Sequence, residues 1–220
     1  MVDRIGALCG LVGVPLLAAA VFLVDPVSTL EASPSSSAEL VAQALTENAD
    51  AARAGAWCGL AGVFLVAVFF ARLHGVLRAA AGPGSWLPHV ALIGGSTFLA
   101  MQLVGVGFAF AASDTDSFAE NPQVAMMIML FGWWFPAVFA PCLAAVMASV
   151  TIVAFTTEAF PAWFAWAVGA LLAGIVVISA LGAAGMASMA GFLGLLVVSA
   201  VVTFHRGEST SGPALAPSVE

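Results

Sequence analysis

The sequence VAMMIMLFGWWFPAVFAPCLAAVMASVTIVAF, residues 124–155, contains no aspartate, glutamate, lysine or arginine. A helix rises about 1.5 Å per residue, so roughly 20 apolar residues cross the ~30 Å hydrocarbon core of a bilayer. This stretch is longer than that, and it contains Pro136 and Pro141, whose missing N–H groups remove helical hydrogen bonds to Gly132 and Ala137. The pattern predicts a kinked membrane-spanning helix.

The whole chain has the same apolar character. Of its 220 residues, 62% are hydrophobic and 8% are charged, and the mean hydropathy is +1.11. Charged residues make up roughly a quarter of an ordinary soluble domain. The composition therefore predicts an integral membrane protein, and the recurrence of uncharged runs predicts its fold class: an all-α, polytopic six-helix bundle.

Six uncharged runs are counted as spans, at about 5–24, 55–71, 90–112, 124–155, 162–181 and 186–204. The last two runs are interpreted as a tight hairpin around Gly182 to Gly185, because one helix through both would be about twice the necessary length. Residues 1–206 thus form the predicted transmembrane domain. The remaining residues, 207–220, include two prolines and several Ser and Thr, and are predicted to be a disordered cytoplasmic tail.

A short amphipathic helix is predicted outside the membrane, between the first two spans. Ser36 and Glu39 have the spacing of a capping box, which marks the beginning of a helix. The apolar residues that follow recur at helical spacing: Leu40, Val41, Ala44 and Leu45. This apolar face would either lie on the bilayer surface or cap the bundle.

The arginines predict the orientation of the chain. In a six-span chain they fall mainly on one side, which holds Arg4, Arg72, Arg78 and Arg206, while Arg53 falls on the other. Cytoplasmic loops are enriched in arginine and lysine, so both termini are predicted to be cytoplasmic, in the plasma (inner) membrane of a bacterium. The formal net charge is −7 and falls on the outer loops, which either concentrate cations or are simply solvated.

Several functional classes are disfavoured. Lysine is absent and the arginines are scattered, so the chain has no basic stripe for nucleic acid. Phosphate-binding loops, serine-nucleophile signatures and metalloprotease signatures are missing. No acid or arginine lies well inside a span, where such groups mark ion and proton paths. We predict no catalytic residues, no nucleic-acid partner and no cofactor, although a bound lipid is compatible with the composition.

One alternative is a metal site at the cytoplasmic ends of the helices, where four candidate ligands fall: His74, His89, His205 and Glu158. Imidazole nitrogens and carboxylate oxygens are common zinc ligands. These residues come from different helices, and no sequence spacing makes them converge. Ordinary polar side chains at the membrane interface are the default interpretation of these residues.

A second alternative is a pocket in the bundle interior. Gln102 is the most polar side chain well inside any predicted span, and Trp133 and Trp134 lie at a similar expected depth. We expect Gln102, the two indoles and the carbonyl freed by Pro136 to meet. Their meeting would form either a pocket for a lipid or another apolar small molecule, or hydrogen-bonded contacts that hold the helices together.

Several parts of the chain carry a resemblance: residues 3–8 (DRIGAL), 52–55 (ARAG) through 69–73 (FFARL), the outer loop with its short helix, and 160–166 (FPAWFAW). In these parts the chain resembles a bacterial family catalogued as domain-of-unknown-function 4386. The resemblance implies a six-helix bundle in the inner membrane and supplies no catalytic residues. Other six-span actinobacterial families have a similar composition.

Three hypotheses about function follow. The first is a non-catalytic accessory or assembly subunit, which recruits a membrane protein or a second copy of itself through glycine-rich helix faces. The second is a binder or carrier of lipid or another apolar small molecule, built around the kinked fourth span. The third is a metal-dependent membrane enzyme that uses the histidines and Glu158.

Overall fold

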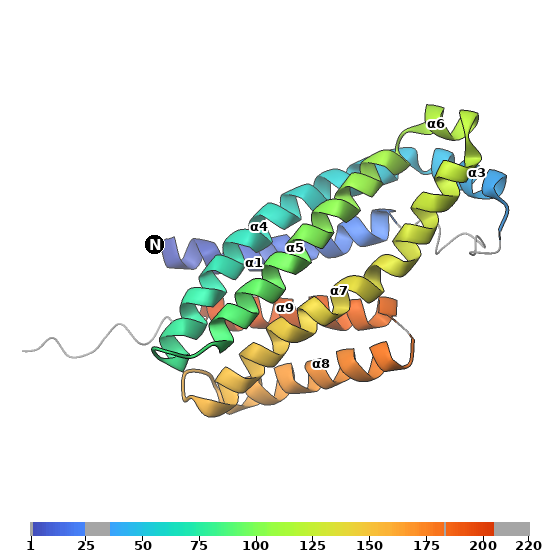
Figure 1. Ribbon diagram of the computed structural model, residues 1–220. Coiled ribbons are helices and arrows are strands. Elements are labelled where there is room, and N and C mark those ends of the chain that lie inside the picture. Colours follow the sequence, from blue (N-terminus) through green and yellow to red (C-terminus); the bar gives the residue numbers. More distant parts are fainter. Residues whose placement is uncertain (1, 25–35, 183, 205–220) are drawn as a thin grey trace, which may run out of the picture.

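The computed structural model describes residues 2–24, 36–182 and 184–204. Within these ranges the chain forms eight α-helices and no strand, which confirms the predicted all-α fold (Figure 1). The helices are α1 (Val2–Val24), α3 (Ala38–Glu47), α4 (Ala49–Ala81), α5 (Leu87–Ala112), α6 (Thr115–Glu120), α7 (Pro122–Thr156), α8 (Ala162–Ala180) and α9 (Ala184–Phe204). The predicted tail, 207–220, lies outside the described residues.

The chain is an integral membrane protein. Five helices, α4, α5, α7, α8 and α9, are long and apolar enough to cross a bilayer, and α1 contains a shorter apolar stretch, Leu8–Val21. Helix α4 begins before the predicted span 55–71 and ends after it, because its polar ends, which include Asp50 and Arg78, continue the helical hydrogen bonding. The helix is therefore longer than the uncharged run from which it was predicted.

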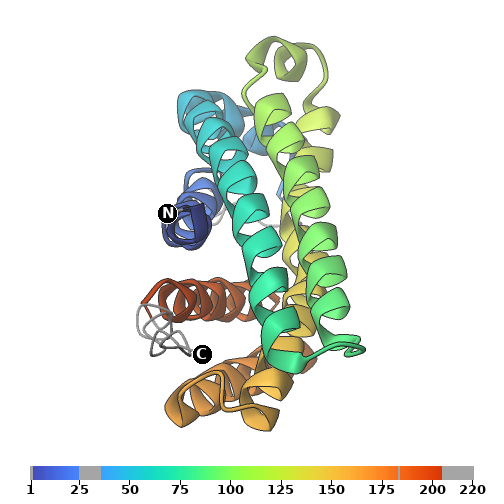
Figure 2. The same ribbon diagram turned by 90° about the vertical axis from the view of Figure 1, so that its left-hand side faces the viewer.

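Five helices form a closed ring in which each packs against its two neighbours: α1, α4, α5, α7 and α9. The ring closes between the first and last helices of the chain, while α8 packs on the outside against α7 and α9. The three longest helices, α4, α5 and α7, are inclined to α1, α8 and α9 (Figures 1 and 2). The ring buries a continuous apolar core that contains Phe98, Leu143 and Leu195.

Glycines bring α1 and α4 into close contact. A Cβ atom added at Gly13 would lie 2.8 Å from Leu65 Cβ and 3.1 Å from the backbone nitrogen of Val66. In the opposite direction, a Cβ atom added at Gly62 would lie 3.0 Å from the backbone oxygen of Gly13. Small residues let helices approach in this way, and such packing replaces the hydrophobic effect that is missing between helices in lipid.

Helix α7 begins at Pro122 and continues through its two interior prolines, Pro136 and Pro141, and Figure 1 shows it bending along its length. Proline inside a helix removes one hydrogen bond and crowds the preceding turn, which is a known cause of bends. The predicted hairpin between α8 and α9 is also present: α8 ends at Ala180 and Gly182 has a φ of +79°. Glycine adopts this left-handed conformation without steric cost.

The predicted outer helix is present as α3, with one correction to its cap. Ser37, and not Ser36, is the N-cap residue, and its Oγ accepts a hydrogen bond of 3.3 Å from the Leu40 amide. Helix α3 packs against α6 and α7 with Val41 and Leu45 buried, so its apolar face caps the bundle. Helix α6 was not predicted from the sequence, and its six residues are too few for a clear helical period.

The close α1–α4 contact predicts that Gly13→Ala lowers the stability of the bundle by about 1–3 kcal/mol, because the new methyl group meets side chains and backbone that must move. Unfolding midpoints in detergent measure the effect. The matched control is Gly174→Ala in α8, where a Cβ atom would meet nothing within 4 Å. The control should leave the midpoint unchanged or raise it slightly, since alanine favours helix. Equal midpoints for Gly13→Ala and the natural protein would contradict this packing.

Candidate functional site

Gln102 lies inside the bundle, as the interior-pocket hypothesis requires. Its side chain on α5 is 7% exposed, and it follows Phe98 by one helical turn. Phe98 is fully buried, and its ring lies against Phe70 of α4, Phe139 of α7 and Phe192 of α9, with ring centroids 6.4, 5.7 and 6.0 Å away. The amide thus lies next to an aromatic layer built by four helices.

The packing of α5 against α7 fixes the level of Gln102. A Cβ atom added at Gly94 would lie 2.9 Å from the Cys142 backbone oxygen, and one added at Gly105 would lie 2.9 Å from the Phe135 ring. Nearer the α6 end of the two helices, the rings of Phe108 and Phe131 stack with their centroids 3.8 Å apart. In this antiparallel register, Gln102 lies opposite the turn of α7 that contains Pro136.

The four predicted pocket residues can be placed only in part. Trp133, Trp134 and Pro136 belong to α7, but their side chains lie outside the part of the structure that is described. Gln102 lies about 12 Å along its helix from Phe110 and about 24 Å from Trp86. It therefore lies between the middle of the bundle and the α6 end, about 6 Å from the midpoint. The meeting of all four residues stays a prediction.

The buried amide of Gln102 is not fully hydrogen-bonded. Within the described part of the chain, its Nε2 atom has no hydrogen-bond partner. Leaving a buried polar group unpaired costs about 1–3 kcal/mol, and more in a hydrocarbon environment. Such groups in native proteins have an explanation in strain, in bound water or in a ligand.

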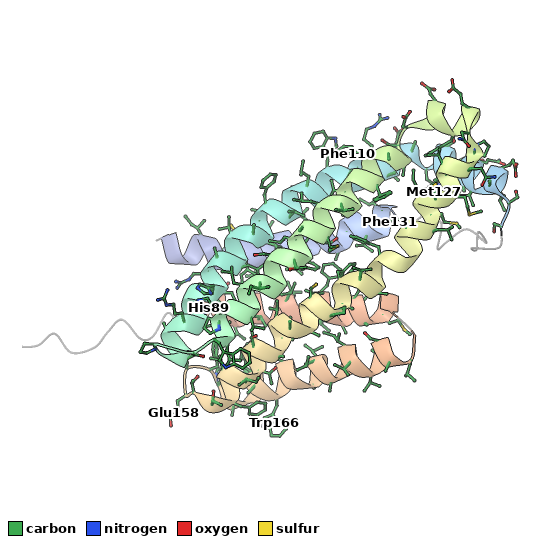
Figure 3. All side chains as sticks on the ribbon, viewed as in Figure 1. His89, Phe110, Met127, Phe131, Glu158 and Trp166 are labelled. Carbon is green, nitrogen blue, oxygen red and sulfur yellow. The ribbon has the colours of Figure 1, made fainter. Side chains whose placement is uncertain are left out.

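Two of the four predicted metal ligands lie together. His74 on α4 and His89 on α5 have ring centroids 5.4 Å apart, and His74 Nδ1 lies 3.0 Å from the Pro88 backbone oxygen. Glu158 is exposed in the connection between α7 and α8, apart from His89 in Figure 3, and His205 lies outside the described residues. The described residues contain no group of three or more His, Cys, Asp and Glu side chains that could hold a metal ion. The four-ligand site stays a prediction.

A second hydrophobic core lies at the opposite end of the bundle and was not foreseen from the sequence. It is formed by α3, α6 and the adjoining ends of α4, α5 and α7, with these residues buried: Val41, Ala42, Leu45, Ala52, Ala112, Phe118, Ala125 and Met129. The sequence indication was weak. Phe118 is the one large apolar residue in an acidic connection, and its presence there indicates only that its side chain is buried.

This second core extends past the level at which the bundle would leave the bilayer. Trp57, which is 60% exposed and lies 5.3 Å from Phe110 between ring centroids, has the position of an interfacial anchor. Trp57 and Arg78 are about 32 Å apart along α4, which matches one hydrocarbon thickness. Residues 49–56 of α4 lie on the far side of Trp57 from Arg78, at the same end of the bundle as α3, α6 and residues 122–129 of α7. We call these segments the outer projection.

The outer projection is acidic and holds one arginine in place. Its exposed carboxylates are Glu39, Glu47, Asp50, Asp114, Asp116 and Glu120. Arg53 reaches across to the end of α5, where its Nη2 lies 3.5 Å from the Ser113 backbone oxygen, and it lies 3.9 Å from Asp50. A cation at a helix C-terminus is favourable, although the exposure of this pair keeps the gain small.

No protein-family model matches the chain, and neither a curated protein nor a solved structure matches it. The resemblance to the family catalogued as domain-of-unknown-function 4386 therefore stays a prediction.

The second core predicts that the outer projection is a separately stabilised unit. Phe118→Ala removes a side chain that is 2% exposed, which should cost the projection about 3–5 kcal/mol of local stability. Hydrogen exchange of the α3 and α6 amides should accelerate by at least about 100-fold, with little change in α8 and α9. Phe64→Ala, at a position that is 65% exposed, is the control and should change neither. Faster exchange in α8 and α9 would contradict a separate unit.

Proposed function

We propose that the protein is a non-catalytic accessory or assembly subunit of a membrane complex, and that its outer projection docks a partner protein. The supporting observation is the second hydrophobic core. A loop that only joined two spans would need no buried core, whereas this projection buries Val41, Leu45 and Phe118 almost completely. Such burial holds a surface in one conformation beyond the bilayer, and a preordered surface loses less entropy when it binds.

The chemistry of the outer projection favours a basic partner. Its carboxylates are exposed, and it also presents Leu40, which is 50% exposed, and Met127, which is 71% exposed (Figure 3). Methionine is enriched at interfaces, where it contributes flexible apolar contact area. Surrounding charges of one sign accelerate encounter with a partner of the opposite sign and set its orientation. A positively charged segment with an apolar anchor fits this surface.

The proposal includes a topology of six membrane crossings, in which α1 crosses the bilayer in addition to the five long apolar helices. Helix α1 has 23 residues, and its first turn contains Arg4, while the opposite end of the bundle carries the acidic projection. Arg72 and Arg78 lie toward the same end as Arg4, so the excess of positive charge favours a cytoplasmic location for that end. Both termini would then be cytoplasmic in a bacterial plasma membrane, with the projection outside.

Reporter fusions test this orientation. Alkaline phosphatase inserted after Gly182, in the α8–α9 hairpin, should be active because the hairpin would lie on the periplasmic side. The matched fusion after Gly84, in the α4–α5 connection, should be inactive, and green fluorescent protein should give the reverse result at both positions. Phosphatase activity at Gly84 with none at Gly182 would invert the topology and place the projection in the cytoplasm.

Site-specific photocrosslinking tests the docking surface. A photoreactive amino acid at Met127 should form a discrete protein adduct in native membranes, because the side chain is exposed on the projection. The adduct should become several-fold weaker in high salt, since charge attraction between exposed groups is screened. It should also become weaker when Glu39→Lys and Asp116→Lys reverse part of the surface charge.

The matched control is the same photoreactive residue at Trp166, which is 70% exposed on α8 at the other end of the bundle (Figure 3). This position should give no adduct of the same mass. If the Met127 adduct is insensitive to both charge-reversing substitutions, or if Trp166 gives the same adduct, the projection is not the docking surface. An adduct of twice the chain mass would identify the partner as a second copy of the chain.

A second candidate function is the binding of an apolar small molecule, and the buried amide of Gln102 is the observation that favours it. This function is compatible with the first, because the two sites lie in different parts of the fold. The outer projection is built on its own core, whereas Gln102 belongs to the interior of the helix ring.

A further inference from the structure

The interior of the bundle places an unpaired donor on one helix opposite weakened hydrogen bonding on its neighbour. The donor is Gln102 Nε2, which is buried and has no partner within the described residues. On α7, Pro136 has no N–H to donate to the Gly132 carbonyl, and Pro141 has none to donate to the Ala137 carbonyl. Gly132 and Ala137 lie on either side of the level that the α5–α7 register gives to Gln102.

Two exposed glycines lie on α5 and α7, nearer the α6 end of the bundle than Gln102. Cβ atoms added at Gly107 of α5 and at Gly132 of α7 would meet nothing within 4 Å, and both glycines are exposed. Phe108 and Phe131 stack between the two helices at neighbouring positions. At both glycines an added Cβ atom would meet no described side chain, and we take this exposed surface as the point of entry from the bilayer.

We propose that Gln102 and the proline-freed carbonyls of α7 bind the hydroxyl group of an apolar molecule that enters from the bilayer. A hydroxyl oxygen accepts a hydrogen bond from Gln102 Nε2, and its O–H donates one to an α7 carbonyl. One atom thus satisfies a donor and an acceptor that lie on different helices. The rings of Phe98, Phe135 and Phe139 supply apolar contacts for the rest of the molecule.

Other ligand chemistries fit less well. An ether or a ketone accepts a hydrogen bond from the amide but leaves the carbonyl unpaired. A carboxylate or an ammonium group brings a charge into hydrocarbon, and the described interior of the ring offers no opposite charge to neutralise it. The site therefore selects a neutral alcohol. This selection rests on the small-molecule binding proposed above for Gln102 and is independent of the function proposed for the outer projection.

Photolabelling with a diazirine derivative of 1-octanol tests the site on the full chain in lipid nanodiscs. Labelled residues mapped by mass spectrometry should concentrate in residues 98–109 of α5 and 131–139 of α7. Excess 1-octanol should compete for this labelling, whereas octyl methyl ether, which cannot donate a hydrogen bond, should compete at least about fivefold less well. Equal competition by the ether would overturn the proposal.

Substitutions provide the second measurement. Gln102→Leu should reduce labelling of the two segments about tenfold, because the donor is lost and the hydroxyl would be buried without it. Gln102→Met, which keeps the length of the side chain, should give the same loss and serves if the leucine variant does not fold. The control, Gln123→Leu in the first turn of α7, changes an exposed glutamine and should leave labelling unchanged. Undiminished labelling in both Gln102 variants, or labelling spread evenly over lipid-facing segments, would show that no alcohol site exists.

Discussion

Hydrocarbon offers no hydrogen-bond partners, and this constraint determines the structure more than any other. Every backbone amide inside the bilayer must be paired within the protein, so the described chain is built from helices. Several hydroxyl side chains obey the same rule by bonding backward to their own helix, as Ser149 does to Ala145 at 2.9 Å and Thr203 does to Ser199 at 2.7 Å. Gln102 Nε2 and Thr151 Oγ1 are different, because neither buried atom has a hydrogen-bond partner within the described residues. The alcohol site proposed for the bundle interior depends on the first of these two departures.

The fold class and the short outer helix could be predicted because they depend on local composition. An uncharged run of the right length predicts a helix regardless of its neighbours, and the residues around Ser37 predict a helix start to within one position. Helix register could not be predicted, because it depends on where glycines such as Gly94 and Gly105 let a second helix approach. The second core was missed for a related reason. Its members are scattered over five segments, and Phe118 has no apolar neighbours in sequence that would reveal a buried face.

The two cores of the protein are held together by different physics. Inside the bilayer, lipid tails are as apolar as leucine, so close packing at positions such as Gly13 and Gly62 distinguishes helix contact from lipid contact. If the outer projection lies in water, as we propose, the burial of Phe118 and Val41 is driven by the hydrophobic effect. A change of detergent or lipid should therefore affect the ring first, while temperature and denaturant should affect the projection first. The alcohol site in the ring should therefore be more sensitive to detergent and lipid, and the docking surface on the projection more sensitive to temperature and denaturant.

The closure of the ring between α1 and α9 has a consequence for biosynthesis. Gly10 of α1 packs so closely on Ser199 of α9 that an added Cβ atom would lie 2.7 Å from the serine Cβ. The two helices are the first and the last of the described helices in chain order, so the glycine-rich face of α1 lacks one of its neighbours until α9 has been synthesised. Until then, lipid or another protein must occupy the side of α1 that α9 later covers.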